Sequence, residues 1–135
     1  MRFVDTNILL YRVSTDPAES DKQAVASQIL DHDDLRSSVQ VLQEFYVQAT
    51  RLSRSEALRH EEAIALIESW KRFPIQETTV ALLDAALVAK NRWKLSYWDA
   101  AIIEAARLSR CDIVLSEDLN HGQSFDGVRV QNPFA

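Results

Sequence analysis

The feature that most constrains this chain is the alternation of short apolar segments with longer stretches of helical periodicity, and the chain has few residues that form turns. It carries two glycines and three prolines in 135 residues. So few turn residues favour helices and short connections over a many-stranded sandwich. Three segments have the apolar or β-branched character of strands: Phe3-Val4, Asp112–Leu115 and Val128–Val130. Leu35–Ser38 is expected to be a further short strand or strand end. We therefore predict an α/β fold with a mostly parallel sheet, in a single domain over residues 1–135.

Helix signals fill the intervals between these strands. Pro17 can open a helix over 18–30, and Ser53-x-x-Glu56 matches a capping box for a helix that continues to about 72. Thr79 and Ser96 can cap helices over 80–91 and 97–108. The remaining helical stretches are a turn at 8–11 and a helix over 39–52. Three helices have expected buried faces: Ala24, Val25, Ile29 and Leu30; Val41, Phe45, Ala49 and Leu52; Leu58, Ala65 and Ile67.

Composition excludes several classes of protein. Cys111 is the single cysteine, so an internal disulfide and a cysteine-based zinc site are ruled out, and the three histidines lack metal-ligand spacing. The first residues are not those of a signal peptide and no apolar run is long enough to span a membrane, so we expect a cytoplasmic protein. The net charge of −5 argues against nonspecific nucleic-acid binding through bulk charge. It does not exclude a nuclease, because acids that hold metal ions are themselves a source of negative charge.

Four carboxylates occupy informative positions. Asp5 ends the first strand, Asp118 follows the apolar strand at 113–115, and Glu44 and Asp99 lie on amphipathic helices. Functional residues of parallel sheets collect at the carboxyl ends of the strands. Like charges do not gather without cost unless a cation joins them. If the four converge, the sequence predicts a divalent-metal site, and a set of oxygen ligands favours Mg²⁺ or Mn²⁺.

Each acid also has a simpler structural interpretation. Asp5 can cap the helix that follows it, and Asp99 can complete a capping box with Ser96. Glu44 can be a solvated residue at the edge of its helix. Asp118 lies in a polar turn, where Glu117 is a competing candidate for the same role.

The order and context of these acids resemble those of a known family. The segments that carry the resemblance are Phe3-Val4-Asp5-Thr6-Asn7, Glu44, Trp98-Asp99-Ala100-Ala101-Ile102 and Leu115-Ser116-Glu117-Asp118-Leu119. Together they resemble the PIN-domain ribonucleases, specifically the VapC toxins of toxin–antitoxin pairs. The resemblance implies a three-layer α/β/α sandwich. It implies that Asp5, Glu44, Asp99 and Asp118 are catalytic metal ligands, with Thr6, Asn7 and Ser116 in support.

The same resemblance implies a function and partners. We expect a Mg²⁺- or Mn²⁺-dependent endoribonuclease in which an activated water attacks phosphorus and leaves a 5′-phosphate and a 3′-hydroxyl. We also expect a homodimer and a cognate antitoxin that fills an apolar groove near the site. Four residues are candidates for these surfaces, although core packing explains them equally well: Tyr11, Leu42, Phe45 and Tyr46.

Basic residues near aromatic ones are candidates for RNA contact. Arg92, Lys94 and Trp98 combine phosphate-binding and base-stacking groups, although cations at a helix end also favour its dipole. Arg51 and Arg54 form a second, weaker candidate. Three further readings stay open: a phosphatase with Asp5 as nucleophile, a receiver-like or interaction domain whose acids only cap helices, and a PIN fold that binds RNA or antitoxin without cutting.

Overall fold

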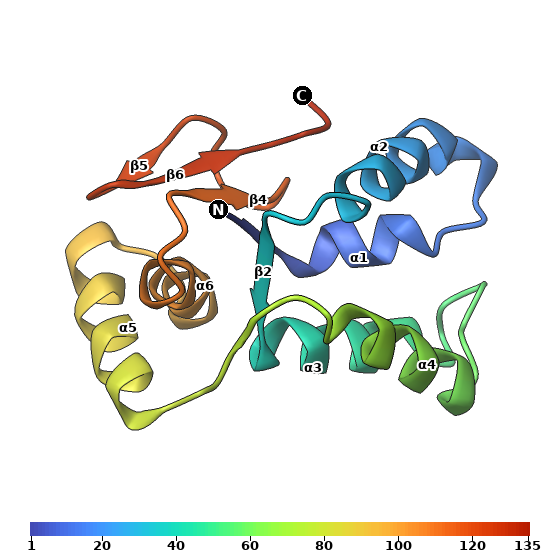
Figure 1. The fold of residues 1–135 in the computed structure, drawn as a ribbon, viewed down its shortest axis with the longest axis horizontal. Coiled ribbons are helices and arrows are strands. Elements are labelled where there is room, and N and C mark those ends of the chain that lie inside the picture. The colour runs from blue at the N-terminus through green and yellow to red at the C-terminus, as the bar shows by residue number, and fades with distance from the viewer.

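A computed structural model describes all 135 residues and contains one mixed sheet of six strands in the order β3-β2-β1-β4-β6-β5 (Figure 1). Every neighbouring pair is parallel except β5 and β6, which are antiparallel. The strands are β1 (Arg2–Val4), β2 (Leu35–Ser38), β3 (Ile75–Gln76), β4 (Ile113–Leu115), β5 (Ser124–Phe125) and β6 (Val128–Gln131). The mostly parallel sheet predicted from the sequence is confirmed, and β5 is an additional short strand.

Helices cover the sheet on both sides and make the three-layer α/β/α arrangement that was predicted. Helices α5 and α6 pack together at one side, and α1 and α2 lie together at the other (Figure 1). Helix α3 follows β2 directly and packs on both α1 and α4. The helices are α1 (Thr6–Arg12), α2 (Ser20–Leu30), α3 (Val39–Ala49), α4 (His60–Trp70), α5 (Val80–Trp93) and α6 (Tyr97–Leu108), with a 3₁₀ turn at Pro17–Glu19.

Helices α5 and α6 begin at the capping residues predicted from the sequence, and Ser38 is a further cap. The hydroxyls of Ser38, Thr79 and Ser96 accept hydrogen bonds from backbone N–H groups in the first turns of α3, α5 and α6. Helix α5 ends where Lys94 adopts a left-handed backbone conformation with φ of 55°. No helix has the combination of length and apolar character that crossing a bilayer requires.

The segment between α3 and α4 differs from the prediction. Helix α3 ends at Ala49 and α4 begins only at His60, where Glu62 accepts a hydrogen bond from the N–H of Arg59 at 2.9 Å. The expected capping box at 53–56 does not form, because Glu56 instead accepts from the N–H of Thr15 at 2.8 Å. Leu52 is consequently outside α3 and 96% exposed, and the predicted burial of Ala24 and Ala65 is also wrong.

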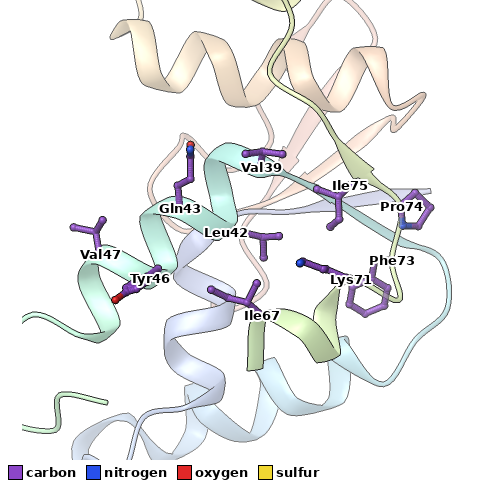
Figure 2. A pocket seen from close by; sticks show the side chains of 10 residues that line it. All are labelled: Val39, Leu42, Gln43, Tyr46, Val47, Ile67, Lys71, Phe73, Pro74 and Ile75. Atoms are coloured by element: carbon purple, nitrogen blue, oxygen red, sulfur yellow. The ribbon is translucent and has the colours of Figure 1, made fainter. Parts of the chain in front are cut away.

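An apolar groove of about 810 Å³, here called the α3–α4 groove, lies between α3, α4 and the segment that leads into β3. Figure 2 shows side chains of α3 and of residues 67–75 facing one another across it. Seven of its ten lining residues are hydrophobic. The lining residues are Val39, Leu42, Gln43, Tyr46, Val47, Ile67, Lys71, Phe73, Pro74 and Ile75.

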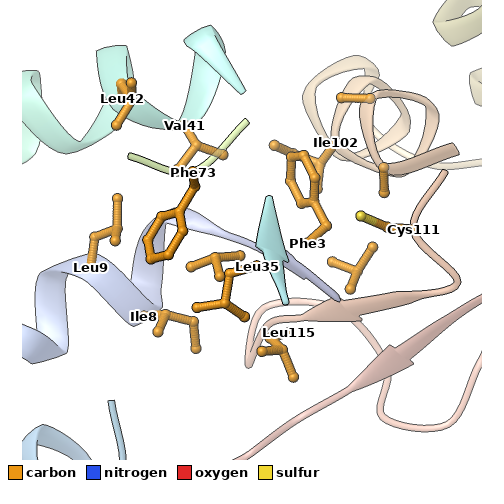
Figure 3. Packing of buried hydrophobic residues seen from close by; sticks show 14 of the residues in the cluster. Phe3, Ile8, Leu9, Leu35, Val41, Leu42, Phe73, Ile102, Cys111 and Leu115 are labelled. Carbon is orange, nitrogen blue, oxygen red and sulfur yellow. The ribbon is translucent and has the colours of Figure 1, made fainter. Parts of the chain in front are cut away.

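The core joins the sheet to the helices on each side of it. Phe3, Leu35 and Leu115 come from three adjacent strands and are fully buried, and Figure 3 shows them between helices α1, α3 and α6. The β1–β4 register pairs Val4 with Leu115. Because of this register, the residues after Val4 and Leu115 emerge side by side at the carboxyl edge of the sheet.

Candidate active site

Asp5 and Ser116 meet at the carboxyl edge of the sheet because β1 and β4 are parallel and in register. The Ser116 hydroxyl donates to Asp5 Oδ2 at 2.7 Å, and the N–H of Thr6 donates to Asp5 Oδ1 at 2.7 Å. Asp5 is therefore the cap of α1, as its simpler interpretation proposed. Its second oxygen accepts from Ser116, which lies 111 positions away, directly after β4. It is only 6% exposed.

Asn7 connects this pair to the turn that follows β4. Its side-chain amide donates to Ser116 Oγ and to Asp118 Oδ2, each at 3.2 Å. Its carbonyl oxygen accepts from the N–H of Glu117 at 3.3 Å, and Ser116 Oγ accepts from the N–H of Asp118 at 3.1 Å. Asn7 and Ser116 thus fix the position of Asp118 relative to Asp5.

Glu44 reaches the same region from α3. Thr6 Oγ1 donates to Glu44 Oε2 at 2.7 Å, so Thr6 and Asn7, neighbours in α1, contact acids from two other parts of the chain, Glu44 and Asp118. Gln40, one turn earlier on α3, donates to Glu44 Oε1 at 2.9 Å and to the carbonyl oxygen of Trp98 at 3.4 Å. Gln40 is 8% exposed, so a buried amide links Glu44 to the start of α6.

Asp99 lies in the first turn of α6, where its N–H donates to Ser96 Oγ at 3.1 Å. Burial raises the pKa of Asp99, a hydrogen bond with Ser96 lowers it, and the negative charges of Asp118 and Glu44 raise it further. Asp99 is thus both part of a helix cap and close enough to two other acids to feel their charge.

The pKa of Asp5 is subject to the same opposing influences, with a larger net rise. Burial is the largest influence and raises the pKa of Asp5 to about 6, against the hydrogen bonds from Ser116 and Thr6 that lower it. The charges of Asp118 and Glu44 add to the rise. Glu44 from α3 and Asp118 from the turn after β4 therefore lie within electrostatic reach of both Asp5 and Asp99. Such an arrangement destabilises the ionised forms unless a cation is added.

Glu117 lies apart from this cluster, although it adjoins Asp118 in sequence. It accepts a hydrogen bond from the Tyr11 hydroxyl and forms an ion pair with Lys22 at 3.0 Å. Lys22 also lies over the ring of Tyr11, 4.9 Å from its centroid. Because Glu117 already has a cationic partner, Asp118 is the acid of this turn that joins the cluster.

Part of the cluster opens onto a polar cavity of about 440 Å³, here called the acid cavity. It lies beside α1 and beneath the segment that connects α3 to α4. Arg54 is its one lining cation, and it pairs with Glu56 at 3.0 Å. The lining residues are Thr6, Asn7, Leu10, Tyr11, Asp16, Glu19, Glu44, Gln48, Arg54, Ser55, Glu56, Glu117 and Asp118.

The family model for the PIN domain matches residues 2–123 of the sequence. This chain belongs to the PIN domain family. The resemblance on which the sequence prediction rested is thereby confirmed, and the fold agrees with it. Among curated proteins, no sequence matches the chain.

Solved structures of similar fold come from toxin–antitoxin systems. A toxin–antitoxin complex from Klebsiella pneumoniae has a TM-score of 0.70 at 20% identity, with 98% of each chain covered. VapC20 of Mycobacterium tuberculosis, described as a sarcin–ricin loop cleaving toxin, has a TM-score of 0.64 at 20% identity, over 94% of this chain and 91% of that one. VapBC2 of Rickettsia felis, bound to a DNA fragment from its promoter, has a TM-score of 0.65 at 12% identity, over 97% of each chain.

The donor set of this PIN domain fits a hard divalent cation. The acids supply only oxygen ligands, which Mg²⁺ and Mn²⁺ prefer. No three His, Cys, Asp or Glu side chains stand close enough together to enclose an ion as they are. The residues that would hold an ion are Asp5 and Asp99, with Glu44 and Asp118 directly or through water.

The candidate RNA-contact residues separate into two groups. Trp98 lines a cavity together with Glu44, whereas Arg92 lines a different cavity and pairs with Asp126 at 3.5 Å. Lys94 contacts Asn91 and lines neither cavity beside the acids. The aromatic member of the predicted set is therefore beside the PIN-domain acids, and the two basic members are elsewhere.

Gln40 is the residue of this site that the sequence prediction missed. A usable signal existed, because Gln40, Glu44 and Gln48 recur every four positions and form one polar stripe of α3. The stripe lies beside the buried row of Val41, Phe45 and Ala49, so its amides were available to Glu44.

Proposed function

We propose that this PIN domain is a metal-dependent endoribonuclease that acts as the toxin of a toxin–antitoxin pair. The observation that carries the proposal is that Glu44 and Asp118, from two separate chain segments, lie within electrostatic reach of both Asp99 and Asp5, a buried carboxylate whose pKa is raised to about 6. Such a cluster is unfavourable in an isolated protein and becomes favourable when it binds a divalent cation. Helix capping alone would require only the acids at helix starts, and Glu44 and Asp118 are not at helix starts.

Each residue of the site has its own role in the proposed mechanism. When bound, Mg²⁺ or Mn²⁺ supplies positive charge for the phosphate oxygens and activates a water for hydrolysis. Asp5 and Asp99 hold the ion. The Thr6 hydroxyl and the Gln40 amide orient Glu44. Asn7 and Ser116 keep Asp118 and Asp5 in fixed positions, as supporting residues around metal ligands do elsewhere.

RNA is the proposed substrate class. The hydrolysis uses water as the nucleophile, so a 2′-hydroxyl is not needed for the chemistry and preference for RNA would come from shape and from contacts to exposed bases. The fold similarity to a toxin described as cleaving the sarcin–ricin loop supports RNA over DNA as the target.

An antitoxin protein is the proposed partner, and the α3–α4 groove is the proposed site for it. The fold similarity to a toxin–antitoxin complex supports a protein partner of this kind. The groove is apolar over most of its lining, as a surface that binds an amphipathic helix is. Leu42 and Tyr46, two of the residues expected to contribute, line it, whereas Phe45 is buried in the core and Tyr11 lines the acid cavity.

We also propose a homodimer. Helix α5 exposes a stripe of apolar side chains opposite the face that packs on α6: Val80, Leu83, Leu87 and Val88. A second copy of the chain would cover this stripe. Sedimentation velocity of the wild type and of Leu87→Glu protein tests it, since a monomeric wild type contradicts the dimer.

The test of activity is cleavage of structured RNA by purified protein. We expect cleavage with Mg²⁺ or Mn²⁺, loss of cleavage with a chelator, and products that carry 5′-phosphates. Asp5→Asn and Asp99→Asn should abolish it, whereas Asp84→Asn, the same change at an exposed position of α5, should not. Cleavage retained by Asp99→Asn protein would contradict the proposal. A domain that binds RNA or antitoxin without cutting predicts no metal-dependent cleavage by the wild type.

A further inference from the structure

A second cavity of about 310 Å³ lies beside the acid cavity, and neither the fold nor the proposed chemistry accounts for it. We call it the Trp98 groove. Its volume is at the lower end of the range of small-molecule sites, ~300–1,000 Å³. Five of its seven lining residues have polar or charged side chains. The lining residues are Gln40, Gln43, Glu44, Val47, Gln48, Arg51 and Trp98.

The Trp98 groove adjoins the acid cavity, and through Gln43 and Val47 it also adjoins the α3–α4 groove. Glu44 and Gln48 line both the Trp98 groove and the acid cavity, so they form the boundary between the two. A chain bound with one phosphate at the acids would therefore extend directly into the Trp98 groove. Neighbouring units of one linear ligand can occupy the two cavities.

Trp98 gives this groove an exposed aromatic face. Its side chain is 64% exposed, although large aromatic side chains usually bury most of their surface. The ring does not lie loose on the surface, since Tyr97 packs against it edge to face with the centroids 5.0 Å apart. The backbone carbonyl of the same residue accepts the hydrogen bond from Gln40 at 3.4 Å. The ring is thus held beside Asp99 and Glu44 with one face available.

Arg51 supplies the cation of this groove. The two other cations near the acids are engaged, because Arg54 pairs with Glu56 and Lys22 with Glu117. The Arg51 side chain is exposed and makes no ion pair or hydrogen bond with the protein. It lies one residue beyond the C-cap of α3, next to a site that is otherwise acidic. A free guanidinium in that position suits a phosphate group.

We propose that the Trp98 groove binds one unstacked nucleobase of a single-stranded RNA segment, next to the phosphate that is cut. The base stacks on Trp98, the side-chain amides of Gln43 and Gln48 face its edge, and Arg51 contacts the adjoining phosphate. Bases within a duplex are already stacked and cannot use the ring, so the groove selects loops and single strands. The inference rests on the proposed function for the class of ligand, and it adds the determinant of substrate shape.

Binding can be separated from cleavage by titrating a short single-stranded RNA into Asp5→Asn protein with Mg²⁺ and following tryptophan fluorescence. Trp70 is buried and Trp93 packs on Phe125, so Trp98 is the tryptophan that a base can reach. We expect RNA to quench the fluorescence, with the quenching kept in Trp93→Phe and lost in Trp98→Phe protein. Duplex RNA of the same sequence should quench little.

Affinity supplies the quantitative test. Alanine at a base-stacking position costs ~1–3 kcal/mol, so Trp98→Ala should weaken binding about 5- to 100-fold, while Trp98→Phe keeps most of the affinity. Arg51→Gln should weaken binding and lower its salt dependence, and Arg129→Gln, an exposed arginine on β6, should do neither. Because Trp98 and Arg51 are exposed, their replacement should not unfold the protein.

The outcomes distinguish this inference from the proposed function. RNA binding with unchanged affinity in Trp98→Ala and Arg51→Gln protein would overturn the inference, and so would an absence of RNA binding. RNA that binds and quenches Trp98 without being cleaved by the wild type would support the groove and contradict the nuclease.

Discussion

Helix α3 borders two surfaces of different character, the acid cavity and the apolar α3–α4 groove. On one side Glu44 and Gln48 line the acid cavity, which is bordered by several carboxylates. On the other side Leu42 and Tyr46 line the α3–α4 groove, which is almost free of charge. Repulsion between carboxylates at the acid cavity raises the free energy of the folded protein, and a bound cation would lower it. The groove is unfavourable because apolar surface faces water, and a protein partner relieves that.

The contrast between the two surfaces gives one short helix a place in both proposed binding events, that of the metal ion and that of the antitoxin. Its third row, Val41, Phe45 and Ala49, is fully buried and fixes the helix against the sheet. Because the rows are set by the helical period, substitutions on one row leave the others in place. We therefore expect that the proposed metal binding and partner binding can be disrupted separately. The substitutions below run from the removal of a proposed metal ligand to the removal of one supporting amide.

Asp118→Asn should cause the largest loss, because it removes a charged ligand from the acid cavity. We expect RNA cleavage to fall by about two to three orders of magnitude, a size comparable to removal of one group that stabilises transition-state charge. Glu117→Gln is the matched control, since Glu117 is paired with Lys22 rather than with the cluster. It should lower thermal stability slightly, as loss of a part-exposed ion pair does, and leave cleavage intact. The reverse result would make Glu117 the fourth acid.

Asp5→Asn should stabilise the metal-free protein at neutral pH. The carboxyl has a pKa of about 6 in the folded protein and ~3.9 when unfolded, so the folded state holds the proton more tightly. The contribution of Asp5 to stability is therefore greatest at low pH, declines as pH rises from about 4 to 6, and above that is a penalty of about 2–3 kcal/mol. Asparagine removes this penalty.

Urea unfolding at several pH values, with a chelator present, measures the effect. The difference between variant and wild type should be full at pH 7 and vanish near pH 4. Mn²⁺ should stabilise the wild type and have little effect on the variant. A variant less stable than the wild type at pH 7 would show that the hydrogen bonds from Ser116 and Thr6 outweigh the cost of burying the charge.

Ile67→Asp should disrupt the α3–α4 groove and spare the acid cavity. An unpaired charge in an apolar interface costs at least ~2 kcal/mol, so inhibition by the antitoxin should weaken about 30-fold or more. Cleavage of RNA without antitoxin should be unchanged. Ile64→Asp makes the same change on α4 at an exposed position outside the groove and should leave inhibition intact. Equal inhibition of both variants would place the antitoxin elsewhere.

Much of the set of four acids was predictable from local sequence. Asp5 and Asp118 follow apolar strands, and the parallel arrangement of β1 and β4 then brings them to one edge of the sheet. Asp99 is indicated by its position three residues after the capping residue Ser96, at the start of a largely apolar helix. Placing these three acids needs only a strand, a helix start and the rule that parallel strands end together.

The connection from α3 to α4 was not predictable, for a physical reason. Ser53-x-x-Glu56 is a valid capping pattern, but Glu56 finds its partner in Thr15, 41 residues away. A local pattern cannot report a competing contact between distant residues. The same limit applies to Arg92, whose partner Asp126 lies on a turn that no helical period describes.

Gln40→Leu should have the smallest effect, and it tests how the acid cavity is kept in order. Leucine fits a position that is already 8% exposed, so the fold should persist. Glu44 loses a donor to its charged oxygen, and the link from α3 to the carbonyl of Trp98 is lost. A hydrogen bond to a charged group contributes ~1.5 kcal/mol, so the rate of RNA cleavage at saturation should fall about tenfold. RNA affinity in the Asp5→Asn background should change little, because Gln40 acts on Glu44 rather than on the base.

Gln28→Leu, which replaces an exposed glutamine on α2, controls for the loss of a surface amide. A loss confined to affinity would instead make Gln40 a substrate contact in the Trp98 groove.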